Sequence, residues 1–494
     1  MTYNEYKSYM SKIADIGHSI AVLSWDKEVN LPSGSARFRS QQIATLSSIA
    51  HEMLTRPTLG VSLEKLLKDE NLDLKEKNNV ILSYKEYKKA TNFTEEFVIK
   101  RSMLTSETFH AWLKAREEND WSIYLPKLKK LIELKREEAS LLGEAEHLYD
   151  NMLDLYEPGM TVKKLDVIFK DVKEKLLPLL QKFKAKANDS YDFMSKNYDL
   201  DKQWEYGIKV LEAIGYDLTK GRQDKSEHPF TTSFSSEDVR ITTRLKEDDF
   251  AYMLWSTIHE GGHALYEQGI PAEEYGLPSG SYMSLGIHES QSRLWENNVA
   301  RDFAFWEHQF PVMQETFPEQ LSDVNLIDFM RAINNISPNL IRTEADELHY
   351  HFHVMIRYEI EKKLMDGSIE IENLKNEWND LYEEYLGLRP KDDLSGILQD
   401  IHWSHGSLGY FPTYSLGSFY AAQFFEQAKE DIYRLEEKLS HGETGELLSW
   451  LRTNIHVKGH SMEAEELCKE ICGTTLSLHP FLNYMERKYN RLYE

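Results

Sequence analysis

Two histidines four residues apart, with a glutamate directly after the first, form the pattern with the clearest chemistry in this sequence. His259, Glu260 and His263 stand in the segment HEGGH. On a helix, two histidines at this spacing project from one face and can bind one metal ion. Zinc takes neutral imidazole ligands and keeps one position for a water, whose pKa it lowers to about 7. Glu260 would then take a proton from this water and pass it to a leaving amine, which predicts a metal-dependent peptidase.

The two residues between Glu260 and His263 are both glycine. In a helix interior each glycine costs about 1 kcal/mol relative to alanine. Such a cost is understandable where a substrate or a neighbouring backbone must come close. The glycines therefore count against the alternative, a solvated helix that carries two histidines by chance.

A third ligand is expected from the segment that begins near Ser284. One helical stripe of this segment contains Glu289, Ser292, Glu296, Val299 and Phe303. A carboxylate on an inward-facing stripe is costly unless it is paired or bound to a metal. On spacing alone Glu289 is favoured as the third ligand over Glu296, and a buried salt bridge is the alternative for both.

The elements that must position these residues are mainly helical. The HEGGH segment lies in an expected helix over 248–269, for which Asp248 and Asp249 suit the start and Gly269 the end. Residues 229–245 are rich in Thr, Ser, Phe, Val and Ile and predict one or two short strands. Elsewhere, apolar residues recur at helical spacing, as in 120–143 and 165–183. This predicts a mainly α single domain over residues 1–494, with a small sheet just before the HEGGH helix.

Composition excludes several classes of partner. The 494 residues carry a net charge of −24, so nucleic acid and anionic membrane surfaces would be repelled. No apolar run approaches the roughly 18 residues that span a bilayer, and the N-terminus does not resemble a secretory signal. The two cysteines, Cys468 and Cys472, share one helical face, which is a poor arrangement for a disulfide. Together these features predict a cytoplasmic protein with reduced thiols.

Five separated blocks of sequence carry a resemblance to a known family. They are DVRIT at 238–242, HEGGH at 259–263, HESQ at 288–291, IRTEAD at 341–346 and GILQDIHW at 396–403. Weaker similarity is found in LSWDKEVNLPSG near the N-terminus and in YDNMLDLYEPGMT from Tyr149. With these blocks in this order, the chain resembles the carboxypeptidase Taq family of zinc metallocarboxypeptidases.

This resemblance implies an enzyme that removes single residues from the C-termini of peptides with broad specificity. It also implies a mainly helical fold with a long, deep substrate cleft, and a homodimer. His259, His263 and Glu289 would bind the metal, and Glu260 would be the catalytic carboxylate. Two imidazoles and a carboxylate suit Zn²⁺ and would also accept Co²⁺ or Mn²⁺.

The resemblance further implies that Arg342 binds the C-terminal carboxylate of the substrate, which a guanidinium does with two parallel hydrogen bonds. His402 and Tyr414 would help to hold that carboxylate or stabilise the oxyanion. Arg342 lies in an expected helix where Asp346, four residues on, could orient it, and a purely structural pair is the alternative. Arg240 lies on the predicted strand, where an edge strand would pair with peptide backbone, and a structural salt bridge is equally expected.

Two other functions fit parts of the same pattern. A zinc endo-oligopeptidase of related helical fold would keep the metal chemistry without needing a free C-terminus. A non-catalytic helical binding protein with a degenerate site would bind no metal. A peptide with an amidated C-terminus distinguishes the first of these from a carboxypeptidase, because only a carboxypeptidase needs the free carboxylate.

Overall fold

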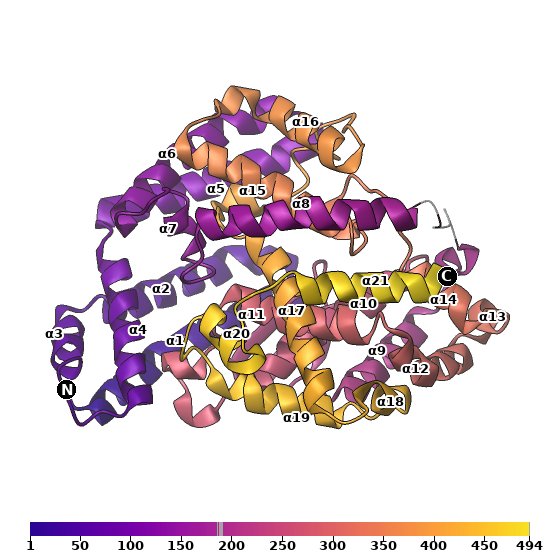
Figure 1. Ribbon diagram of the computed structural model, residues 1–494. Coiled ribbons are helices and arrows are strands. Elements are labelled where there is room, and N and C mark those ends of the chain that lie inside the picture. Colours follow the sequence, from indigo (N-terminus) through magenta and orange to yellow (C-terminus); the bar gives the residue numbers. More distant parts are fainter. Residues whose placement is uncertain (185, 187–190, 494) are drawn as a thin grey trace. The chain divides into compact units, whose positions relative to one another are not determined.

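A computed structural model describes residues 1–184, 186 and 191–493 of the chain (Figure 1). The described residues are mostly helical and also form one small three-stranded sheet. This confirms the predicted mainly α class. Within the described ranges, no helix is long and apolar enough to cross a membrane. The chain forms two compact units, each assembled from three separate stretches of sequence. One domain over residues 1–494 therefore stays a prediction.

Unit 1 contains the described residues of 1–91, 190–333 and 420–477. Its helices are α1 (Tyr3–Val29), α2 (Ala36–Leu54), α3 (Pro57–Leu66), α4 (Leu74–Thr91), α9 (Leu200–Ile214), α10 (Phe250–Gly269), α11 (Leu285–Arg293), α12 (Phe303–Thr316), α13 (Pro318–Leu321), α14 (Leu326–Ile333), α18 (Leu435–Ser440), α19 (Gly445–Asn454) and α20 (Ala464–Cys472). Its short 3-10 helices are η1 (Ser33–Ser35), η2 (Asp192–Ser195), η3 (Ala272–Glu274), η4 (Pro278–Gly280) and η9 (His456–Lys458), and η5 (Leu294–Val299) is a π-helix.

Unit 2 contains the described residues of 92–189, 334–419 and 478–494. Its helices are α5 (Glu95–Glu118), α6 (Trp121–Leu142), α7 (Asp150–Leu153), α8 (Val162–Lys184), α15 (Tyr350–Asp366), α16 (Leu374–Leu386) and α21 (His479–Tyr493). Its 3-10 helices are η6 (Arg342–Glu344), η7 (Ile371–Asn373) and η8 (His402–His405). Helix α17 (Pro412–Asp431) begins in unit 2 and continues into unit 1.

The sheet lies in unit 1 and consists of β1 (Gln223–Lys225), β2 (Thr231–Ser235) and β3 (Asp238–Thr243) in the order β1-β3-β2. Strand β1 runs parallel to β3, and β2 pairs with β3 as an antiparallel hairpin. In the hairpin Thr231 stands opposite Ile241 and Thr232 opposite Arg240. The predicted strands in 229–245 are thus present, and β3 is the central strand.

Helix α10 packs on strands β2 and β3 and on the neighbouring helices α9 and α11. It begins at Phe250 because the Asp249 carboxylate accepts a hydrogen bond from the main-chain N–H of Tyr252 at 3.1 Å, and it ends at Gly269. Its inward face is apolar and includes Met253, Leu254, Ile258 and Leu265. Burying each such side chain contributes roughly 1.5–3 kcal/mol, which gives the HEGGH segment a rigid support.

Helices α1 and α2 pack against one another, and α1 also contacts strand β2. Helix α1 is anchored by three buried side chains, those of Tyr6, Met10 and Trp25. Helix α2, in contrast, buries none of its residues fully. The side chains of this 19-residue helix are therefore exposed or only partly buried within unit 1.

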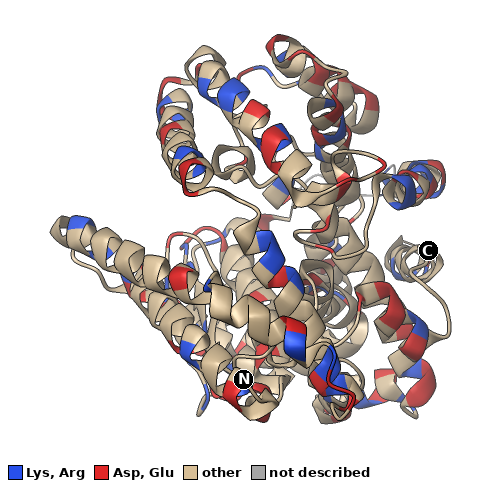
Figure 2. Ribbon diagram, turned by 90° about the vertical axis from the view of Figure 1, so that its left-hand side faces the viewer, with Lys and Arg blue, Asp and Glu red and all other residues tan. Residues whose placement is uncertain are grey.

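Lys and Arg are interspersed with Asp and Glu along many of the helices (Figure 2). The excess of acidic residues is therefore not gathered on a single helix, although some stretches, such as 41–50, carry no charge.

Candidate functional site

His259, His263 and Glu289 form the candidate metal site in unit 1. The Glu289 Oε2 atom lies 3.6 Å from His259 Nε2 and 3.5 Å from His263 Nε2. Two atoms that each lie about 2.1 Å from a tetrahedral ion stand about 3.4 Å apart. Within the described part of the chain, these three residues are the only group of His, Cys, Asp or Glu whose ligand atoms gather closely enough for a metal ion. The donor set fits a divalent transition metal.

Both imidazoles are held so that Nε2 faces Glu289. His259 Nδ1 lies 2.8 Å from Glu296 Oε2, and His263 Nδ1 lies 3.0 Å from the carbonyl oxygen of His288. Each Nδ1–H can therefore donate to a fixed acceptor, which leaves the Nε2 lone pair for a metal. An ordinary surface pair of histidines would not need two such acceptors.

The two carboxylates of the predicted stripe have different surroundings. Glu289 Oε1 accepts a 2.7 Å hydrogen bond from Arg293 Nε, whereas Oε2 faces the imidazoles. Glu296 Oε2 lies 3.3 Å from Arg293 Nη1, and Glu296 Oε1 lies 3.6 Å from Arg301 Nη2. Burial would raise both carboxyl pKa values, but Arg293 and its neighbours hold them well below the usual range. The structure thus brings the Glu289 carboxylate to Nε2 of both imidazoles and places Glu296 in a buried salt bridge next to Nδ1 of His259.

Glu260 lies next to this group and is only 8% exposed. The hydroxyl of Thr231 in β2 donates to Glu260 Oε2 at 2.6 Å and also lies 2.9 Å from the Glu260 carbonyl oxygen. Burial raises the pKa of Glu260 above its ordinary value. A partly desolvated carboxylate with one fixed donor is suited to moving a proton.

The two histidines differ in their ionisation. Burial lowers the pKa of His263 to about 3, and the adjacent His288 adds to this effect. Burial also lowers the pKa of His259, but the carboxylates of Glu289 and Glu296 outweigh it and raise this pKa to about 9. His263 is thus ready to ligate at neutral pH, whereas His259 would release a proton when a metal binds.

The two glycines of HEGGH lie where neighbouring segments come close to α10. A Cβ on Gly262 would stand 2.7 Å from the carbonyl oxygen of Gln291 and from Cα of Ser292 in α11. A Cβ on Gly261 would meet the side chains of Leu211 and Ile214 at 2.9 Å. The expected close approach of a neighbouring backbone is therefore present at Gly262, and it brings Glu289 of α11 to the histidines.

Arg342, in unit 2, has a different partner from the one predicted. It lies in the short η6 rather than in a long helix, because α15 begins only at Tyr350. Its Nε and Nη2 donate to Asp400 Oδ1 at 3.0 and 2.9 Å, and its Nη1 donates to the Tyr350 hydroxyl at 3.1 Å. Asp346 instead accepts the main-chain N–H groups of Leu348 and His349. The predicted Arg342–Asp346 pair is therefore wrong.

His402 and Tyr414 lie together in unit 2. His402 Nε2 is 3.3 Å from the Tyr414 hydroxyl, and the Arg342 guanidinium lies 5.0 Å from the centre of the Tyr414 ring. Burial lowers the pKa of His402 to about 3, so its imidazole is neutral at pH 7. Arg342 and Arg357 overcome the effect of burial on Asp400 and hold its pKa far below the usual range. The structure thus brings together a cation, a neutral imidazole and a phenol, which can recognise an anionic group.

Arg240 lies on the central strand β3, so the argument from an edge strand does not apply to it. Its Nε and Nη2 donate to the two carboxylate oxygens of Asp238, both at 2.8 Å. Its guanidinium also lies 4.4 Å from the ring centre of Trp25. The salt bridge expected as the alternative is present, and strand β2 is the edge nearest to Glu260.

Three residues around these groups were not identified from the sequence. Arg293 could have been found, since it follows Glu289 at a spacing of four in a predicted helix. Thr231 and Asp400 gave no such signal, because their partners lie 29 and 58 residues away along the chain. Asp400 stands within the GILQDIHW block, but nothing local links it to Arg342.

Comparison with known proteins gives consistent matches over the whole chain. The model of a family described as carboxypeptidase Taq (M32) metallopeptidase matches residues 5–489. Thermostable carboxypeptidase 1 of Thermus thermophilus is 38% identical, over 99% of this chain and 98% of that protein. Carboxypeptidase 1 of Bacillus subtilis is 37% identical with the same coverage. The crystal structure of an M32 carboxypeptidase from Deinococcus radiodurans is similar with a TM-score of 0.97 and 36% identity, over 99% of both chains.

Proposed function

This chain belongs to the carboxypeptidase Taq (M32) family of metallopeptidases, and from that premise we propose that it releases single residues from the C-termini of peptides with broad specificity. The observation that carries the proposal is the convergence of His259 Nε2, His263 Nε2 and Glu289 Oε2, with the Glu260 carboxylate beside them. Such a set supplies metal ligands and a base at one place.

The residues that would hold the metal are His259, His263 and Glu289. We assign zinc as the metal, with Co²⁺ or Mn²⁺ as substitutes, because two imidazoles and one carboxylate suit all three. When bound, the ion would polarise the scissile carbonyl and lower the pKa of a water molecule. The salt bridge of Glu296 with Arg293 and Arg301 would keep the His259 ring in its ligating orientation.

Replacing Glu296 with glutamine is expected to weaken zinc binding about 10- to 100-fold, because His259 loses its charged acceptor. A glutamine keeps the size of the side chain, so the ligands themselves remain. Competition with a chromophoric chelator measures the change. Glu315→Gln, on the exposed part of α12, is the matched control and should leave the affinity as it is. Equal zinc affinity of Glu296→Gln and the unmodified protein would contradict this role.

Glu260 would be the general base of the reaction. Its carboxylate would accept a proton from the attacking water and deliver it to the nitrogen of the leaving residue. The Thr231 hydroxyl, 2.6 Å from Oε2, would hold the carboxylate in one orientation during both transfers. Edge strand β2, which carries Thr231, would pair with the peptide main chain and present the scissile bond to Glu260.

Arg342 would bind the free carboxylate of the substrate. Three of its five N–H donors are engaged by Asp400 and Tyr350, and these contacts would fix the plane of the guanidinium. His402 and Tyr414 would hold the same carboxylate or stabilise the oxyanion. Arg240 would contribute indirectly to substrate binding, since it fixes the position of the Trp25 ring.

We also propose that the protein acts as a homodimer in the cytoplasm. The resemblance to the family implies the dimer. The cytoplasmic location is supported by Cys468 and Cys472, both of which are free thiols.

Two peptides that differ only in C-terminal amidation test the proposed activity. The free acid is expected to lose residues one by one from its C-terminus in a mass-spectrometric time course, whereas the amide stays intact over the same period. A chelator should stop the reaction, and added zinc should restore it. Equally fast cleavage of the amide would instead indicate an endopeptidase. A protein that binds no zinc and cuts neither peptide would indicate a non-catalytic binding protein.

A further inference from the structure

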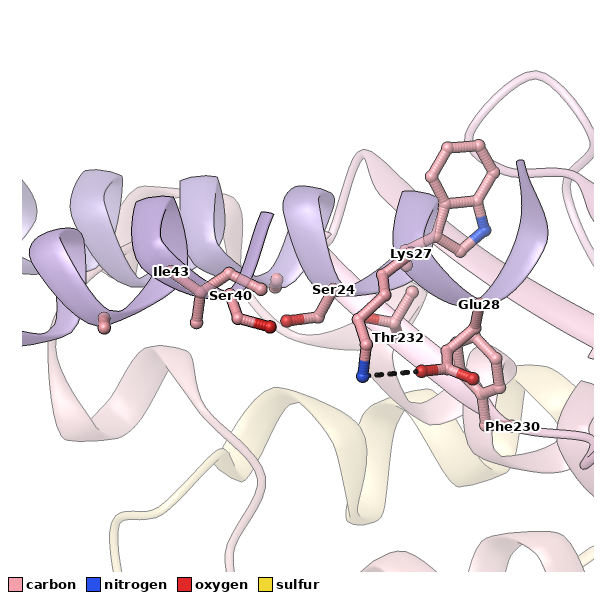
Figure 3. Close-up of a pocket in the computed structure, with 10 residues that line it drawn as sticks. Ser24, Lys27, Glu28, Ser40, Ile43, Phe230 and Thr232 are labelled. Atoms are coloured by element: carbon pink, nitrogen blue, oxygen red, sulfur yellow. Dashed lines mark ion pairs between the residues drawn. The ribbon is translucent and has the colours of Figure 1, made fainter. Parts of the chain in front are cut away.

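A groove of about 650 Å³ lies between helices α1 and α2 and the edge strand β2 (Figure 3). We call it the α1–α2 groove. Its volume is within the range of pockets that hold small ligands. The side chains that matter most to its chemistry come from all three elements: Ser24, Trp25 and Lys27 of α1, Ile43 of α2, and Phe230 and Thr232 at strand β2.

The α1–α2 groove and the proposed base Glu260 are contacted by neighbouring residues of strand β2. Thr231 donates to Glu260 on the α10 side of the sheet, and the next residue, Thr232, lines the groove on the α1 side. Side chains of an extended peptide alternate in the same way. A peptide that pairs with the edge of β2 would therefore direct alternate side chains toward Glu260 and into the groove.

The interior of the groove is mainly apolar. Trp25 is 7% exposed and its ring is fixed by Arg240, whose guanidinium lies 4.4 Å from the ring centre. Ser24 and Ser40 point toward one another across the groove, and Lys27 and Glu28 form a 3.3 Å ion pair in which both side chains are about half exposed (Figure 3). The lining thus suits an apolar side chain.

Helix α2 gives independent support for an apolar occupant. Residues 41–50, QQIATLSSIA, contain no charged side chain although 28% of the chain is charged. None of the residues of α2 is fully buried. The charged residues of α2, Arg37, Arg39 and Glu52, lie outside this stretch. An open, uncharged stretch of ten residues is typical of a binding surface rather than a solvated face.

We propose that the α1–α2 groove is a specificity subsite that binds a large apolar side chain of the peptide, N-terminal to the scissile bond. This inference rests on the proposed carboxypeptidase activity. It adds a preference at an upstream position of the substrate. The groove does not contact the released residue, so the specificity for that residue stays broad.

Peptides that end in the same residue, alanine, test the subsite. They carry Gly, Lys, Leu or Phe at the penultimate or the preceding position, and kcat/KM is measured for each. Burying a leucine or phenylalanine side chain should raise kcat/KM roughly 10- to 100-fold over glycine at one of these positions. A second series varies only the released residue.

Filling the groove should remove this preference. In Ala44→Trp the indole would occupy the space near Ile43, and the ratio of kcat/KM for the Leu and Gly peptides should fall below about threefold. Thr45→Trp is the matched control, since Thr45 is exposed and points away from the groove on the same helix. It should keep the ratio of the unmodified enzyme.

A charge in the groove should change the preference rather than abolish it. Ile43→Asp is expected to favour the Lys peptide over the Leu peptide, which no unfolded or generally damaged protein would do. The proposal is overturned if Ala44→Trp keeps the preference for Leu, or if upstream residues have no effect in the unmodified enzyme. Loss of all activity on free-acid peptides in the unmodified protein would overturn the proposed function instead.

Discussion

Replacing Glu260 with glutamine is expected to lower kcat/KM on free-acid peptides by roughly 10²- to 10⁴-fold, the usual contribution of a general base. Glutamine has nearly the same shape and still accepts the Thr231 hydroxyl through its carbonyl oxygen. It cannot, however, take a proton from water. The loss should therefore be found mainly in kcat, since substrate binding does not depend on this proton transfer.

Three measurements separate this effect from damage to the site. Zinc affinity should stay as it is, because His259, His263 and Glu289 are unchanged, and far-UV circular dichroism should report the same helix content. Glu205→Gln, an exposed position on α9, is the matched control and should retain full activity. A Glu260→Gln protein that binds zinc and digests peptides at an unchanged rate would exclude Glu260 as the base.

The elements around Glu260 could be predicted from the sequence because their signals are local. The helix expected over 248–269 is α10 from Phe250 to Gly269, since the cap at Asp249 acts within one turn. The strands expected in 229–245 are β2 and β3. Strand β1 has only three residues, and all of them, Gln223, Asp224 and Lys225, are polar residues that do not favour strands. It forms because β3 supplies a partner.

The different positions of the two carboxylates in 284–303 could not be predicted from the local sequence pattern alone. A continuous helical stripe makes Glu289 and Glu296 equivalent, seven residues apart on one face. In the structure the regular helix ends at Arg293 and a π-helix, η5, follows from Leu294 to Val299. Glu289 faces Nε2 of His259 and Glu296 faces Nδ1 of the same ring. Such a π-turn is frequent at functional sites, but it has no clear sequence signature.

The surroundings of Arg342 depend on contacts that the local sequence does not reveal. Asp346 at a spacing of four suggests a helical ion pair. Its side chain instead accepts the N–H groups of Leu348 and His349 in the turn that precedes α15. That leaves Arg342 outside the helix and free to pair with Asp400, which lies 58 residues further along the chain. Only the tertiary fold determines this partner.

Replacing Arg342 with lysine or alanine is expected to lower kcat/KM on free-acid peptides by roughly 10²- to 10³-fold, equivalent to about 3–4 kcal/mol. A lysine keeps one positive charge but cannot form two parallel hydrogen bonds to a carboxylate. The loss should be smaller for lysine than for alanine. Arg389→Ala, which removes an exposed arginine of unit 2, is the matched control and should have little effect.

The decisive quantity is the ratio of kcat/KM for a free-acid peptide to that for its amide. Both values are measured on the same preparation, so the ratio does not change if part of the variant is unfolded. This matters because Arg342 is buried against Asp400, and its removal leaves that carboxylate with one arginine fewer. If Arg342 reads the substrate carboxylate, the ratio should fall toward one in Arg342→Ala and remain high in Arg389→Ala. A ratio that stays high in both variants would assign Arg342 a purely structural role in holding Asp400, and another residue would have to recognise the end of the peptide.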